Sequence, residues 1–134
     1  MENTPNLGLK RWDGGDRILH SEFNDNWDKI DTALAARNCR FYTASYTGDG
    51  ELTKTWTFPS KPVLIILTSP TDYFLSVINA REGHGLSHFG MNSVTHISCT
   101  VEGNSATWSV KDQSSSWMGN SSNTKYGMFA ILET

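Results

Sequence analysis

The sequence predicts a mainly β protein, an antiparallel β-sandwich with jelly-roll-like topology, preceded by one α-helix. Two observations predict this fold. Between residues 39 and 134, apolar and polar side chains alternate over seven or eight short segments that turn residues separate, as in half-buried strands. Before them, residues 21–38 are the only stretch with a clear helical period. The chain therefore divides into an arm (1–20), a helix (21–38) and a β domain (39–134).

The predicted helix carries an apolar seam on one face. Phe23, Trp27, Ile30 and Leu34 follow one another at steps of four, three and four residues, a two-heptad pattern. Ser21 is suited to cap the first turn with its hydroxyl. Ordering the helix costs about 1–2 kcal/mol per residue, and burying four large side chains returns only about 1.5–3 kcal/mol each. We therefore expect the seam to be covered, either by the same chain's own β domain or by copies of itself.

The predicted strands follow from period-two alternation. Residues 41–47 and 52–58 flank a Thr-Gly-Asp-Gly turn that suits a hairpin. Residues 63–67 are apolar on both faces, as in a central strand. The spare apolar face of such strands is available for packing on another subunit. Further strands are expected at 73–80, 94–101, 105–110 and 126–132, and long loops at 81–93 and 111–125.

Charge and composition narrow the possible partners. The net charge is −3 and no basic run exists, which argues against nucleic acid. The longest apolar run is far too short to span a membrane, and the first residues lack the apolar core of a secretion signal. Cys39 and Cys99 are the two cysteines. Cys99 occupies an inward strand position that favours a buried thiol, although pairing with Cys39 stays open.

The opening segment, PNLGLKRWDGGDRILHSEFNDNWDKIDTALAAR, resembles the N-termini of tail proteins from phages and prophages of Gram-positive bacteria. In those proteins a Pro-Asn-Leu-Gly-Leu type of arm precedes a helix that reads Phe-Asn-x-Asn-aromatic-x-x-Ile-Asp-x-x-Leu. The segments at 57–67, 107–117 and 123–132 are similar to the small β domains that end tail fibres and receptor-binding proteins. The helix motif corresponds here to Phe23, Asn24, Asn26, Trp27, Ile30, Asp31 and Leu34.

This resemblance implies a structural and adhesive part of a virion. The expected assembly is a homotrimer with the helix as an oligomerising stalk, formed in the bacterial cytoplasm and released by lysis. The expected partners are other tail proteins and a bacterial surface glycan. For the arm, two interpretations remain: Trp12 and the apolar pair Ile18 and Leu19 pack on the helix, or the arm docks on another tail protein.

The candidate ligand-binding residues lie in the predicted loops of the β domain. Aromatic rings stack on the C–H faces of sugars, and amide groups donate to and accept from sugar hydroxyls. The alternative for Trp117 is that it caps the end of the core. The candidates for glycan binding are Tyr73, His84, His88, Trp117, Asn120 and Asn123.

No catalytic residue, metal or cofactor is predicted. The sequence has no Gly-x-Ser-x-Gly elbow, no phosphate-binding glycine loop and no recognisable acid/base pair of carboxylates. His84, His88 and His96 are close in sequence, but loop histidines are usually solvated, and a metal needs three or four ligands in one small volume. Two other functions remain open: a free-standing lectin-like carbohydrate-binding module and a small polysaccharide-degrading enzyme. The helical seam favours the tail protein, because a lone lectin needs no stalk.

Overall fold

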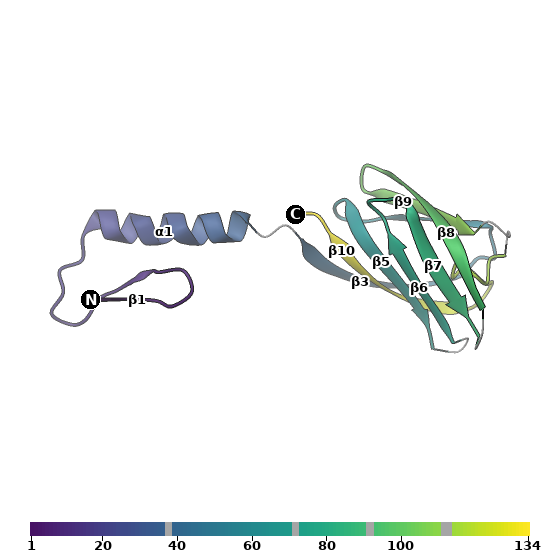
Figure 1. Ribbon diagram of the computed structural model, residues 1–134, viewed down its shortest axis with the longest axis horizontal. Helices are drawn as coiled ribbons and strands as arrows, with labels where there is room; N and C mark the ends of the chain where they lie inside the picture. Colours follow the sequence, from purple (N-terminus) through teal and green to yellow (C-terminus); the bar gives the residue numbers. More distant parts are fainter. Residues whose placement is uncertain (37–38, 71–72, 91–92, 111–113) are drawn as a thin grey trace. The chain divides into compact units, whose positions relative to one another are not determined.

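The structure, a computed structural model, describes residues 1–36, 39–70, 73–90, 93–110 and 114–134. The chain divides into two compact units, residues 1–38 and residues 39–134. The first unit contains the helix and a short hairpin, and the second contains a curled β-sheet (Figure 1). The mainly β class with one helix is confirmed.

The first unit is a helix with the arm packed on it. β1 (Glu2–Asn3) pairs with β2 (Lys10–Arg11), and α1 spans His20–Ala35. The Asn26 side chain clamps the hairpin to α1. Its Oδ1 accepts a hydrogen bond from the backbone N–H of Lys10 at 2.7 Å, and its Nδ2 donates to the Lys10 carbonyl at 3.1 Å. One helical amide thus replaces the water that both backbone groups of Lys10 would otherwise bind.

α1 begins earlier than predicted, and the prediction that Ser21 is its N-cap is wrong. Leu19 has the extended backbone of an N-cap, with φ −99° and ψ 140°, and no side chain caps this end. The Leu19 carbonyl accepts the first helical hydrogen bond, from the backbone N–H of Phe23 at 3.1 Å. Ser21 therefore lies inside the first turn, past the position from which an N-cap hydroxyl accepts. The predicted end at Asn38 lies outside the described residues.

The second unit is one antiparallel sheet of eight strands that curls on itself (Figure 1). The hydrogen-bonded order is β3-β10-β5-β6-β7-β8-β9-β4. Because this ladder continues through all eight strands, the division into two sheets that defines a sandwich is not confirmed. The strands are β3 (Arg40–Thr47), β4 (Thr53–Thr57), β5 (Pro62–Ser69), β6 (Phe74–Asn79), β7 (His84–Phe89), β8 (Ser93–Glu102), β9 (Ser105–Val110) and β10 (Lys125–Leu132).

The hairpin predicted between β3 and β4 is wrong, because these strands are the two edges of the sheet. β3 pairs with β10 and β4 with β9, so their backbone groups have other partners. The two strands meet through side chains instead. The rings of Tyr42 and Phe58 are 5.4 Å apart, and those of Tyr46 and Trp56 are 5.7 Å apart. Trp56 Nε1 also donates to the Tyr42 hydroxyl at 3.2 Å. Aromatic contacts therefore join the edges without a backbone ladder between them.

The core consists of the inward side chains of the sheet, as the alternation predicts. Trp108 and Tyr126 are the largest fully buried residues. The predicted inward positions of β8 and β9 are confirmed, with Ile97 and Val110 both buried. Cys99 is buried and unpaired, and burial raises the pKa of its thiol. Among the described residues, the interior is therefore filled mainly by aromatic and aliphatic side chains.

The long loop predicted at 81–93 is wrong, because β7 lies within it. The inward positions of this strand hold Gly85 and Ser87, which are buried but small, whereas the outward Leu86 is half exposed. A Cβ on Gly85 would lie 2.5 Å from the carbonyl oxygen of Val77. The neighbouring strand thus leaves no room for a side chain, and the usual apolar signal of an inward face is missing.

We expect residues 39–134 to fold without the arm, because every buried hydrophobic residue of the described chain belongs to this unit. A chain that lacks residues 1–20 should keep its far-UV circular dichroism spectrum and a cooperative thermal transition. In limited proteolysis the exposed turn at 13–16 should be cut before the sheet. Unfolding of the truncated chain, or cleavage of the sheet before the arm, would contradict this expectation.

Candidate functional site at the loop end of the sheet

The curled sheet has two distinct ends. At the end where the chain enters, Arg40 pairs with Leu132, and at the other end Thr47 pairs with Lys125. We call the second one the loop end. It carries the connections β3–β4, β5–β6, β7–β8 and β9–β10. The long β9–β10 connection, described from residue 114 onward, provides most of the chain available for a site.

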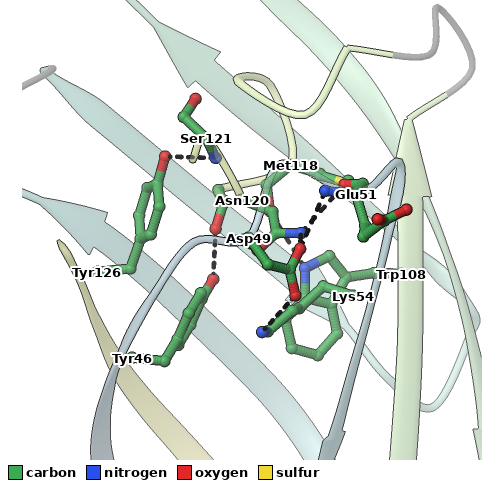
Figure 2. Close-up of polar contacts among 10 residues, drawn as sticks. Tyr46, Asp49, Glu51, Lys54, Trp108, Met118, Asn120, Ser121 and Tyr126 are labelled. Atoms are coloured by element: carbon green, nitrogen blue, oxygen red, sulfur yellow. Dashed lines mark hydrogen bonds and ion pairs between the residues drawn. The ribbon is translucent and has the colours of Figure 1, made fainter. Parts of the chain in front are cut away.

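Three buried aromatic residues hold the β9–β10 connection at the loop end (Figure 2). Burial, followed by the charges of Tyr126 and Asp49, raises the pKa of Tyr46, so its hydroxyl remains a donor at physiological pH. The connection is therefore fixed to the core through its own backbone. The Tyr46 hydroxyl donates to the Gly119 carbonyl at 2.6 Å, Trp108 Nε1 donates to the Met118 carbonyl at 3.1 Å, and the Tyr126 hydroxyl accepts from the Ser121 N–H at 3.1 Å.

Asn120 joins the β9–β10 connection to the β3–β4 connection, and its side chain is fully buried. Its Oδ1 accepts from the Asp49 N–H at 3.2 Å, and its Nδ2 donates to Asp49 Oδ1 at 2.5 Å and to the Glu51 carbonyl at 3.0 Å. The Asn120 carbonyl also accepts from the Gly50 N–H at 2.8 Å. These contacts place Asn120 as a support for the loops rather than as a contact for a solvent-borne ligand.

Asp49 and Lys54 complete this polar network at the solvent boundary (Figure 2). The Glu51 N–H, the Asn120 amide and the Lys54 charge all lower the pKa of Asp49 below its ordinary value. Lys54 Nζ lies 3.6 Å from Asp49 Oδ2 and 4.7 Å from the centroid of the Tyr46 ring. The only sequence signal for this pair was a lysine on the apolar side of strand 52–58.

Trp117 is partly buried and packs against the core from the loop end. Its ring centroid lies 5.9 Å from that of Phe89, and its carbonyl accepts a hydrogen bond from the Ser87 hydroxyl. This contact is what the alternative interpretation predicts, in which Trp117 caps the end of the core. Trp117 as a residue is only partly buried, so it remains a candidate for ligand contact.

The remaining candidates are divided between the two ends. Tyr73 and Asn123 are exposed at the loop end, and both have left-handed backbones, with φ of 49° and 61°. His88 points outward from β7 near the same end. His84 begins β7 at the entry end, where its Nε2 lies 3.2 Å from Glu82 Oε2. The structure therefore places Trp117, Tyr73, Asn123 and His88 at one end and His84 at the other.

A shallow hollow of about 430 Å³ lies on the outside of the sheet at the loop end. Small and hydroxyl-bearing residues surround it, together with one cation. It contains none of the candidate residues, and no period or motif in the sequence marks it. Its lining is Ser45, Thr68, Ser69, Pro70, Lys125, Tyr126 and Gly127.

The seam of α1 is the second candidate functional surface. Trp27 and Leu34 are each 58% exposed and Phe23 is 47% exposed, and Ile30 is only partly buried. The rings of Phe23 and Trp27 are 5.9 Å apart in an edge-to-face contact. The arm contacts α1 through other positions, among them Asn26. Within residues 1–38, the seam is therefore an apolar helix face that the arm leaves uncovered.

No group of three His, Cys, Asp or Glu side chains within the described ranges is arranged to hold a metal ion. In the same parts of the chain, no helix has the length and apolar character needed to cross a membrane.

Comparisons of the chain with protein-family models, with curated proteins and with solved structures found no match in any of the three. A function can therefore be inferred only from the residues and surfaces of the chain itself.

Proposed function

We propose that this protein is an adhesive structural component of a phage tail that assembles as a homotrimer through the seam of α1. The observation that carries the proposal is the exposed apolar seam of Phe23, Trp27, Ile30 and Leu34. In a bundle of three helices, these side chains would pack as knobs into the holes of neighbouring helices. The number three comes from the resemblance to tail proteins, since the seam residues alone do not set the number of strands.

The arm supports this assignment by its position on α1. Lys29 Nζ donates to the Gly8 carbonyl at 3.0 Å and forms an ion pair with Asp25 at 2.9 Å. These contacts occupy helix positions off the seam, so the hairpin and a helical bundle can coexist. We propose that the outer surface of the arm contacts other tail proteins in the virion.

We propose that the β domain serves as the small sandwich-like domain of a receptor-binding protein and binds a bacterial surface glycan at its loop end. Tyr73 is 83% exposed and Trp117 is only partly buried, so these two residues are the aromatic candidates for stacking on sugar C–H faces. A shallow site of this kind binds weakly. Three linked copies raise the avidity by about 10²–10⁴ through effective concentration.

A lectin-like module without a tail is the second candidate, because the loop end would serve it equally well. The seam distinguishes the two functions. A lectin that acts alone would be monomeric. The aromatic side chains of α1, which are about half exposed, would then have no interface to form.

We expect Tyr73→Ala and Trp117→Ala each to abolish binding of the fluorescently labelled trimer to host cells. The melting temperature should change by only a few degrees, because neither side chain is fully buried. Trp12→Ala is the matched control, since it removes an aromatic ring from the arm and should leave cell binding intact.

Two outcomes would contradict the glycan site. If Trp117→Ala lowers the melting temperature by about ten degrees or more, the ring is part of the core. If both variants melt normally and still bind cells, the loop end is not the adhesive surface, and the protein has only a structural role.

A further inference from the structure

The outer face of the sheet has two chemically different parts. Over β4 and β9 the outward side chains are hydroxyl-bearing, among them Thr53, Thr55 and Thr107. Over the other strands the outward side chains include six exposed large hydrophobic residues, which we call the apolar face. These are Phe41 (72% exposed), Val94 (62%), Leu86 (50%), Leu75 (47%), Val77 (41%) and Phe129 (37%).

The strand register makes the apolar face continuous. Phe129 lies opposite Ile66, Ile66 lies opposite Val77, and Val77 lies opposite Leu86, which forms one row across four neighbouring strands. The ring of Phe41 lies 5.4 Å from that of Phe129 and extends the row to the edge strand. Directly opposed side chains in a sheet are in contact range. Leu75 lies two residues from Val77 on the same face of β6, and Val94 is separated from Leu75 by His88. The face thus has a continuous apolar row from Phe41 to Leu86, with Leu75 beside it and Val94 beyond His88.

The apolar face is also free of ionised side chains over most of its area. On the described parts of β3, β10, β5, β6 and β7, the outward positions hold one Lys, which is Lys125 at the loop end, and no Arg, Asp or Glu. His84 lies at the entry-end margin beside Glu82, whereas His88 lies within the face between Leu75 and Val94, and His96 lies opposite Leu86. The row from Phe129 to Leu86 can therefore be desolvated without burying a Lys, Arg, Asp or Glu side chain.

The exposed area is large for a solitary domain. The six side chains expose on the order of 500 Å², which is at the upper end of the range for the largest patch on a monomer. Stable interfaces bury about 800 Å² per partner. The hydroxyl-rich part of the same sheet has the polar side chains expected of a solvent-exposed surface. We therefore expect the apolar part to be buried against another protein surface.

We propose that the apolar face is a second contact between copies of this chain, formed between the β domains of one trimer. This inference rests on the proposed assembly through α1. Four residues separate Ala35 at the end of α1 from Arg40 at the start of β3, a span of at most about 18 Å. A tether this short holds neighbouring β domains at about millimolar effective concentration.

A second copy fits the face better than a foreign protein does. Each copy supplies an uncharged apolar surface of the same extent, and the tether supplies it at high local concentration. The two contacts would then act together: the seam brings the β domains close, and the apolar face adds to the stability of the trimer.

The test compares Val77→Glu with Thr55→Glu in the full-length chain by sedimentation equilibrium. Both positions point outward from the same sheet and are exposed, so either carboxylate is tolerated by a single domain. We expect Val77→Glu to raise the concentration of half-dissociation by about tenfold or more, and Thr55→Glu to change it by less than about twofold. Leu86→Gln provides a neutral second variant with a smaller effect in the same direction, and circular dichroism verifies the fold.

The outcomes separate this inference from the proposed function. A trimer of equal affinity in all variants would overturn the inference and leave assembly through α1 standing, with the face open to a different protein. Association that depends on Val77 but not on Ile30 would support the face and overturn the seam. A wild-type chain that is monomeric at every concentration would overturn both.

Discussion

Replacement of Trp108 by Ala should destabilise the β domain by about 3–5 kcal/mol, a large part of the 5–15 kcal/mol that stabilises a typical domain. The indole is fully buried, so its removal leaves a cavity in the middle of the core. It also removes the donor to the Met118 carbonyl, an acceptor in a fully buried residue. Urea unfolding of the full-length chain, followed by far-UV circular dichroism, measures the loss.

The matched control for this prediction is Trp27→Ala, which deletes the same side chain from the exposed seam of α1. This variant should change the free energy of unfolding of the β domain by less than about 0.5 kcal/mol when measured on the dissociated chain. If the two variants lose similar amounts of unfolding free energy, Trp108 does not stabilise the core as described.

Replacement of Ile30 by Asp should dissociate the trimer without unfolding the sheet. Ile30 lies in the middle of the seam, and a three-fold bundle would place three carboxylates against one another in an apolar environment. Each buried ion costs several kcal/mol, which offsets most of the gain from the remaining seam residues of the same chain. Sedimentation at tens of micromolar should then give the mass of one 14.9 kDa chain, with an unchanged strand signal in circular dichroism.

Thr32→Asp is the control for Ile30→Asp, because it adds the same charge to an exposed position on the opposite side of α1. This variant should keep the trimeric mass. If Ile30→Asp also keeps it, the seam is not the interface between copies.

The sequence predicted the local elements well and their partners poorly. Alternation located the inward residues of β8 and β9, because large apolar side chains such as Trp108 occupy them. The same rule missed β7. The backbone of Val77 lies so close to Gly85 that there is no room for a side chain at this inward position. A turn sequence predicted a hairpin between β3 and β4, but pairing between distant strands depends on packing that no local pattern records.

In the candidate site, too, residue types could be predicted from the sequence, but their partners and positions could not. An asparagine in a polar loop has the composition of a sugar contact, and only the structure reveals that Asn120 is buried and bound to Asp49 and Glu51. His84 and His88 are close in sequence, but a strand carries them to opposite ends of the sheet. The seam, in contrast, was visible from spacing alone, because helical periodicity is a local property.

Sedimentation equilibrium of the wild-type chain tests assembly through α1 most directly. Over about 1–100 µM, a range in which mass action resolves moderate affinities, we predict a species of three times the 14.9 kDa chain mass, with dissociation only at the lowest concentrations. A single 14.9 kDa species throughout this range would contradict it.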